Sequence, residues 1–158
     1  PRPADTEPPR EKEASPGLPA GELQLLVVAS AAQVAAGEVV TVDVMASSST
    51  AVVDAPLHLT FDPNAVEFVD GVPGDFLTQG GSSVVFLADG RSRPGDVAIA
   101  AGRVTREQGA SGSGLLCRVH LRGVGAGASP VLVAQAKAWS TSGEQLIVRS
   151  TGTAVTVR

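Results

Sequence analysis

From Leu23 to the end of the chain, apolar and polar residues alternate with a period of two. Val40 and Val42, for example, flank Thr41. Successive side chains of a β-strand point to opposite faces, so this pattern predicts strands with one buried and one exposed face. No segment shows the helical period of about 3.6 residues over a useful length. The alternation therefore restricts the fold to the all-β class.

Turn-forming residues divide the alternating segments into short strands. Asp62-Pro63-Asn64 and Pro94-Gly95 are two such turns, and Gly109–Gly114 is predicted to be a flexible loop. Nine strands are predicted, at residues 23–28, 39–46, 55–61, 65–70, 83–88, 96–103, 115–122, 130–138 and 153–158. A single layer would leave its apolar face in water, so two packed antiparallel sheets are expected.

Residues 1–20 differ in composition from the rest of the chain. They hold six of the eleven prolines and seven charged residues, and Leu18 is their one large apolar side chain. Such a segment buries too little apolar surface to offset the entropy lost on ordering. We expect a disordered or polyproline-like linker at 1–20, followed by one domain at 21–158. The alternative is a leader segment that docks on the domain.

Composition excludes several classes of partner. The net charge is −4 and the basic residues are scattered, so no nucleic-acid partner is expected. Aromatic residues make up 3% of the chain, which argues against stacking platforms for bases or sugars. No uninterrupted apolar run approaches the roughly 18 residues of a membrane helix, so membrane insertion of this segment is not expected.

No constellation of residues points to catalysis, a cofactor or a metal. The chain has two His and one Cys, so Cys117 has no intrachain disulfide partner and is interpreted as a small buried apolar residue. There is no Gly-x-Ser-x-Gly nucleophile elbow. The glycine-rich run Gly123–Gly127 joins two predicted strands and opens no helix, so it is not a phosphate loop. We therefore predict a protein that is not an enzyme, with no cofactor and no metal site.

Four segments, in order, resemble the cohesin domain. The segment 55–68, APLHLTFDPNAVEF, resembles two cohesin strands joined by an aromatic-Asp-Pro turn. The segment 34–46 is similar to the cohesin opening V-x-x-G-(D/E)-x-V-x-V-x-V. The segment 112–121 is similar to the seventh strand, and 152–157 to the closing G-x-V-x-V strand.

This resemblance implies a nine-stranded antiparallel jelly-roll sandwich without catalytic chemistry. It implies a module that docks a small helical dockerin on one exposed sheet face. The role implied is scaffolding or anchoring in an extracytoplasmic bacterial assembly, either secreted, at the cell surface or associated with the outer membrane. The partner would be dockerin-like or an envelope or secretion component. A structural module of a secretion complex is an alternative role.

The candidate docking residues are those that alternate with core positions on three strands. If Leu57 and Val97 face the core, their neighbours face out, and these neighbours are small or apolar where a solvated strand would carry Thr, Lys or Glu. The resemblance implies that the three strands share a sheet. The predicted partner-binding residues are Pro56, His58, Thr60, Ala98, Ala100, Leu132 and Ala134. The alternatives are a loop or the N-terminal segment covering this face, or a merely alanine-rich composition.

Trp139 carries the competing hypothesis. It is the one Trp, and it is expected to end the strand at 130–138. There it would stack on a sugar, so a carbohydrate-binding module with a polysaccharide partner is the alternative function. Sugar-binding sandwiches align two or three exposed aromatic residues, however, and the four Phe are better used in the core. A core or rim position for Trp139 is therefore the competing interpretation.

Overall fold

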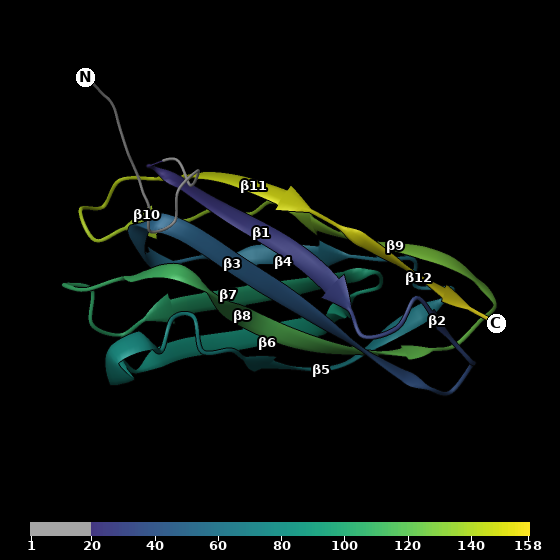
Figure 1. Ribbon diagram of the computed structural model, residues 1–158. Coiled ribbons are helices and arrows are strands. Elements are labelled where there is room, and N and C mark those ends of the chain that lie inside the picture. Colours follow the sequence, from purple (N-terminus) through teal and green to yellow (C-terminus); the bar gives the residue numbers. More distant parts are fainter. Residues whose placement is uncertain (1–19) are drawn as a thin grey trace, which may run out of the picture.

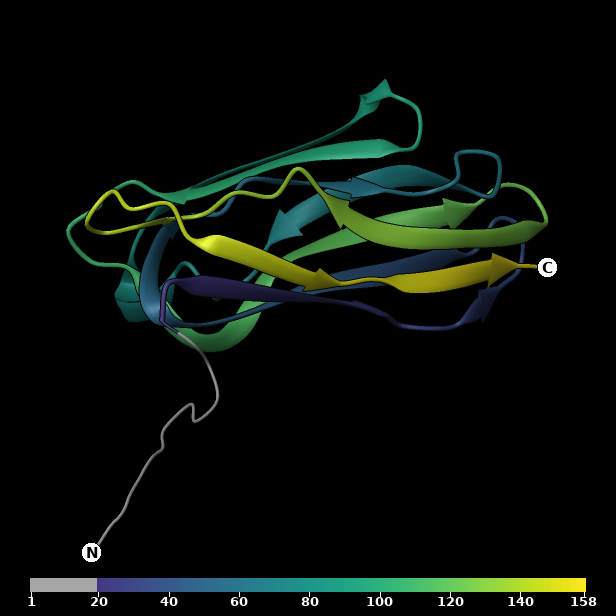
Figure 2. The same ribbon diagram turned by 90° about the horizontal axis from the view of Figure 1, so that it is seen from above.

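The protein, seen in a computed structural model that describes residues 20–158, is a sandwich of two β-sheets (Figures 1 and 2). Apart from Ala20, the predicted linker at 1–20 lies outside the described residues. The strands are β1 (Glu22–Ala29), β2 (Gln33–Val34), β3 (Val39–Asp54), β4 (Leu57–Thr60), β5 (Val66–Pro73), β6 (Val84–Arg93), β7 (Asp96–Arg103), β8 (Ala110–Gly123), β9 (Gly127–Ala134), β10 (Trp139–Ser140), β11 (Ile147–Thr151) and β12 (Thr153–Val157).

Strand pairing defines the two layers. The back sheet has the order β5-β8-β3-β1-β11, and the front sheet has the order β6-β7-β4-β9-β12-β2. The end of β3 joins the layers, because Asp54 pairs with Gly102 of β7. The all-β, jelly-roll-like sandwich predicted from the sequence is confirmed, and each of the nine expected strands is present. A single turn of 3-10 helix covers Gln79–Gly81.

Two strand pairs are parallel, which the antiparallel expectation did not include. β11 runs parallel to β1, and β12 runs parallel to β2. The segments β1–β2 and β11–β12 each pass from the back sheet to the front sheet in the same direction, and the second changes layers at Gly152. A Cβ atom at Gly152 would lie 2.5 Å from Cδ2 of Leu132 and 2.7 Å from the carbonyl oxygen of Val131. The crossing therefore needs glycine.

The structure also moves several predicted boundaries. Gly109–Gly114 is not a free loop, because β8 begins at Ala110 and Ser113 pairs with Ser47 in the extended β3. The two hydroxyls lie 3.1 Å apart. Trp139 does not end the strand at 130–138, since β9 stops at Ala134 and Trp139 begins the separate strand β10. β3 and β8 are longer than predicted, because their backbones pair beyond the segments in which apolar and polar residues alternate.

The core lies between the two layers and follows the alternation. Val40 and Val42 of the back sheet and Leu57 and Leu59 of the front sheet are all at most 1% exposed. Each such side chain contributes roughly 1.5–3 kcal/mol to stability when fully buried. The four Phe are used as expected: Phe61 and Phe76 are buried, and Phe68 and Phe86 pack against the core.

Cys117 is buried within this core and has no disulfide partner. Burial, with a smaller contribution from Asp43, raises the pKa of its thiol to about 12. A thiol with so high a pKa is not a nucleophile at neutral pH. Cys117 is therefore the small buried apolar residue that the sequence predicted. Among residues 20–158, no helix is long and apolar enough to cross a membrane.

Candidate partner-binding face

The outer surface of the front sheet, here called the front face, is formed by the outward side chains of β6, β7, β4 and β9. Strand register sets its residues in rows. His58 of β4 lies opposite Ala98 of β7 on one side and Ala134 of β9 on the other. Thr60 lies opposite Leu132. Pro56 immediately precedes β4, and Ala100 lies opposite Leu87 of β6. All seven predicted residues therefore share one face.

The floor of the front face is made of small side chains. Along β7 the outward residues are Asp96, Ala98, Ala100 and Gly102, so the side chains become smaller toward the end of the strand. A depression of about 400 Å³ lies over this floor, here called the central depression. Its lining includes Pro56, His58, Leu87, Asp89, Gln135 and Lys137. Small floor residues allow the backbone of a partner to approach closely.

Exposed apolar side chains border the floor. Val85 and Leu87 of β6 are 60% and 62% exposed, and Leu132 of β9 is 47% exposed. Only Leu132 was identified from the sequence. Val85 and Leu87 could have been found in the same way, because they alternate with Val84 and Phe86, which pack against the core. The outward residues of β6 therefore belong to the same candidate site.

Gln135, at the edge of the central depression, has an unusual backbone. Its φ is 50°, and among residues 20–158 it is the one non-glycine residue with a positive φ. Non-glycine residues in this region carry strain, and such strain clusters at functional sites. The backbone turns there, after β9 ends at Ala134, and Lys137 then donates its N–H to the carbonyl of Pro56 at 2.9 Å. This turn forms the wall of the depression opposite β6.

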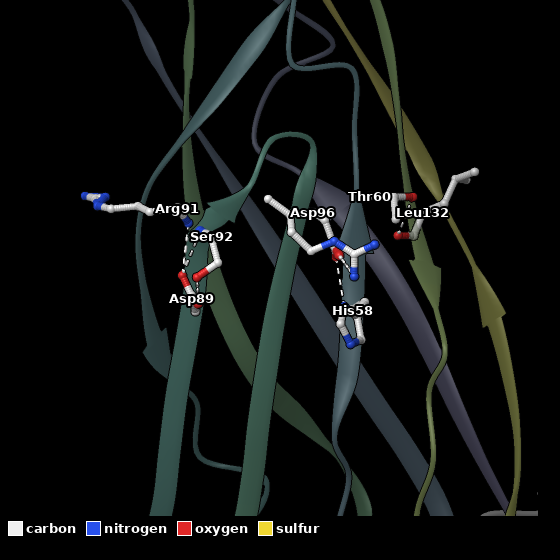
Figure 3. A network of polar contacts seen from close by, with 8 residues as sticks. His58, Thr60, Asp89, Arg91, Ser92, Asp96 and Leu132 are labelled. Atoms are coloured by element: carbon white, nitrogen blue, oxygen red, sulfur yellow. Dashed lines mark hydrogen bonds and ion pairs between the residues drawn. The ribbon is translucent and has the colours of Figure 1, made fainter.

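Two acidic side chains of the front face, Asp96 and Asp89, are held by neighbours. His58 Nδ1 lies 2.9 Å from Asp96 Oδ1 (Figure 3). Arg93 Nη1 lies 3.9 Å from the other oxygen of Asp96. The carboxylate of Asp89 accepts a hydrogen bond from the Ser92 hydroxyl at 2.5 Å and one from the Arg91 N–H at 3.0 Å, and these lower the pKa of Asp89. Asp89 is thus an anion at neutral pH.

The outer surface of the back sheet has a different character. Its strands carry ion pairs between neighbouring side chains: Arg118 with Asp43 at 2.7 Å, Arg122 with Glu67 at 2.9 Å and Arg149 with Glu22 at 3.1 Å. His120 Nδ1 is also within hydrogen-bond distance of Asp70. Burying these charges under a partner would remove their hydration, which is costly. The exposed apolar side chains of the back sheet, such as Leu26 and Ile147, therefore lie among charged neighbours.

Trp139 lies at one end of the front face rather than on a surface of its own. Its strand β10 pairs with the end of β3, where Trp139 lies opposite Asp54. Trp139 lines a hollow together with Pro56, Val85, Ala100 and Arg106. The structure thus brings Trp139 next to two of the predicted docking residues, a proximity that sequence spacing did not reveal.

Within the described part of the chain, no group of three or more His, Cys, Asp or Glu side chains could hold a metal ion. His120 and Asp70 form a pair on the back sheet, and His58 and Asp96 form a pair on the front sheet. What this fold offers is an exposed sheet face for binding, which defines a β-sandwich binding module.

Comparison with known proteins gives the family. The model of the cohesin domain family matches residues 25–157, so the chain belongs to the cohesin domain family. Cohesin domains are non-catalytic binding modules, which confirms the prediction that this chain is not an enzyme. No curated protein matches the sequence significantly.

Solved structures share the fold at low sequence identity. A non-cellulosomal cohesin from Archaeoglobus fulgidus is 17% identical, with a TM-score of 0.68, covering 87% of this chain and 91% of that one. A type II cohesin from Acetivibrio cellulolyticus is 13% identical, with a TM-score of 0.73, covering 87% and 95%. The sixth cohesin of scaffoldin B from the same species, solved with a Cel5 dockerin mutant, is 16% identical, with a TM-score of 0.71, covering 87% and 99%.

Proposed function

We propose that this cohesin domain binds a dockerin module through its front face. The observation that carries the proposal is the contrast between the two sheet surfaces. The front face joins a floor of alanine, proline and glycine to exposed apolar side chains, whereas the exposed apolar side chains of the back sheet, such as Leu26 and Ile147, lie among ion pairs that link neighbouring strands. Cohesins of similar fold have been solved in complex with dockerins, which supports this class of partner.

The dimensions of the front face suit one helix. Neighbouring strands lie about 4.8 Å apart, so β6 and β9 are separated by three such spacings, roughly 14 Å. An α-helix with its side chains is about 10–12 Å across. A helix would therefore fit between Leu87 on β6 and the turn at Gln135, over Ala98 and Ala100. Burial of Leu87 and Leu132 would then supply the apolar contribution to affinity.

We propose a scaffolding or anchoring role in an extracytoplasmic assembly, in line with the scaffoldin origin of similar cohesins. An envelope or secretion component is the alternative protein partner. The carbohydrate alternative depends on Trp139 alone, and the polar groups beside it are paired with each other (Asp54 with Arg106). It remains a prediction to be tested in parallel.

The test is a binding panel. Probes are the purified dockerin modules encoded in the source genome, together with the Cel5 dockerin of Acetivibrio cellulolyticus. Ala98→Arg and Leu132→Arg, each with an unchanged melting temperature, should weaken the tightest pair by about 30-fold or more, because each places a charge inside the interface. Leu26→Arg is the matched control, since Leu26 is 48% exposed on the back sheet.

Two results would contradict the proposal. One is the absence of binding to every dockerin at concentrations of tens of micromolar. The other is a bound dockerin whose affinity is unchanged by both front-face arginines but lowered by Leu26→Arg. Retention on immobilised polysaccharide that is lost in Trp139→Ala would favour the carbohydrate alternative.

A further inference from the structure

A second hollow, of about 350 Å³, lies at the end of the front face beside β10 and is here called the end hollow. It shares Pro56 and Ala100 with the central depression. The two therefore follow one another along β4 and β7 as one continuous trough. Trp139 and Val85 stand on opposite sides of its outer end, from β10 and β6.

Gly102 makes room for the Asp54 carboxylate at the end hollow. It is the last outward position of β7 before Arg103, opposite Val85 of β6 and Asp54 of β3. Because Gly102 has no side chain, the Asp54 carboxylate lies directly over it, and a Cβ atom there would be 2.1 Å from Asp54 Oδ1. Asp54 is held in turn by an ion pair with Arg106. The strand thus has its smallest residue where Asp54 borders the hollow.

The charged groups around the end hollow already have partners within the protein. Asp54 and Arg106 pair with each other, and the hydrogen bond to Asp54 raises the pKa of Arg106. Arg103, only 4% exposed, donates to the backbone carbonyls of Leu77, Gln79 and Gln108 at 2.8–3.1 Å. The surface left for a ligand comes from Val85, Pro56, Ala100 and Trp139.

This distribution selects an apolar ligand over a sugar. A sugar ring on Trp139 would need free donors and acceptors around it, and the nearest carboxylate and guanidinium are engaged with one another. An apolar side chain needs only the wall of Trp139 and Val85. Trp residues that line such pockets are frequent among the residues that dominate binding energy.

On this basis we propose that the end hollow is an anchoring subsite that receives one apolar side chain, such as Leu, Ile, Met or Phe, from the helix docked on the front face. This inference rests on the proposed function. It also sets the distance along the docked helix between the anchoring side chain and the residue over Ala98. Gly102 lies four residues beyond Ala98, about 14 Å along the strand, which a helix spans in about nine residues. The anchoring side chain should therefore lie about nine positions from the residue over Ala98.

The experiment measures the affinity of the tightest dockerin from the panel for Trp139→Ala and Val85→Ala. Trp139→Ala should weaken binding about tenfold or more, and Val85→Ala about three- to tenfold. Val85→Ala keeps the test decisive should Trp139→Ala unfold, because Val85 is exposed. The matched control is Val28→Ala on the back sheet, also an exposed valine, which should bind as the wild type does. An alanine scan of the dockerin helix should find one apolar position whose effect disappears in Val85→Ala.

The outcomes separate this inference from the proposed function. If Ala98→Arg abolishes binding while Trp139→Ala and Val85→Ala bind as tightly as the wild type, the end hollow is not an anchoring subsite and the front face still is the docking surface. If Ala98→Arg and Leu132→Arg leave the affinity for the dockerin unchanged, the proposed function itself is contradicted. Polysaccharide retention that depends on Trp139, with dockerin binding unchanged in Trp139→Ala, would replace the apolar ligand with a sugar.

Discussion

His58 and Asp96 face each other diagonally across β4 and β7, with 2.9 Å between Nδ1 and Oδ1, where β7 begins on the front face (Figure 3). Both side chains are half-buried, and their neighbours Ala98 and Thr60 are small. This pair is a polar site beside a floor of small side chains. A partner that covers the front face would take the pair out of water.

We expect Asp96→Ala and His58→Ala to separate binding from stability. In the free domain the pair is partly solvated, so each change should alter the free energy of unfolding by less than about 1 kcal/mol. In the complex the remaining partner would be buried without its counterpart, which costs about 2–5 kcal/mol. Titration calorimetry with the bound dockerin, with urea unfolding of the free domain, checks both. If the variants lost as much free energy of unfolding as free energy of binding, the His58–Asp96 pair would have a structural role only.

Arg103 should contribute much more to stability than the neighbouring Arg106. The buried guanidinium of Arg103 holds the carbonyls of Leu77, Gln79 and Gln108, which lie on two loops beside β7. Arg103→Ala leaves those carbonyls without a donor and should cost roughly 3 kcal/mol. Arg106→Ala, at an exposed ion pair, should cost less than about 1 kcal/mol. Urea denaturation of both variants gives the comparison, and similar losses would contradict it.

Cys117 should make the domain less stable at alkaline pH. Its pKa is about 12 in the folded state, whereas the ordinary value for a free thiol is 9.0. Between these values the unfolded chain has lost the proton that the folded chain keeps, so the free energy of unfolding falls as pH rises. The slope is about 1.4 kcal/mol per pH unit. Unfolding curves of the wild type and Cys117→Ala at pH 8, 9 and 10 should therefore converge or cross, since the variant lacks this dependence. If the free energy of unfolding fell equally with pH in the wild type and in Cys117→Ala, the raised pKa of Cys117 would be contradicted.

Gly152→Ala should destabilise the crossing between the layers. The added Cβ would meet Leu132 Cδ2 and the Val131 carbonyl at 2.5 and 2.7 Å, and the latter is backbone that cannot move aside freely. Overpacking of this kind costs about 1–3 kcal/mol. Ala154→Val, at an exposed position on β12, is the control and should stay near the wild type. Thermal unfolding is the measurement, and an unchanged melting temperature for Gly152→Ala would contradict the close packing.

The alternation of residues was enough to predict which side chains of the front sheet point outward. For example, Leu57 is buried and the next residue, His58, points outward. Val131 and Leu132 differ in the same way. The alternation did not reveal the change of layers at Gly152, because the requirement for glycine comes from β9, which is distant in sequence. It also missed β10, since a two-residue strand has no period. The position of Trp139 at the end of the front face could not be predicted, because it depends on the pairing of β10 with β3.

β1 and β11 lie side by side and parallel, with five residue pairs in register from Glu22 with Ile147 to Leu26 with Thr151. Tension applied to the two ends of residues 20–158 would pull β1 and β11 in opposite directions along their length. Their hydrogen bonds would then be loaded together in shear instead of opening one after another. We expect single-molecule stretching from the termini to meet high resistance. The same two strands would keep the front face in shape while the module is under load.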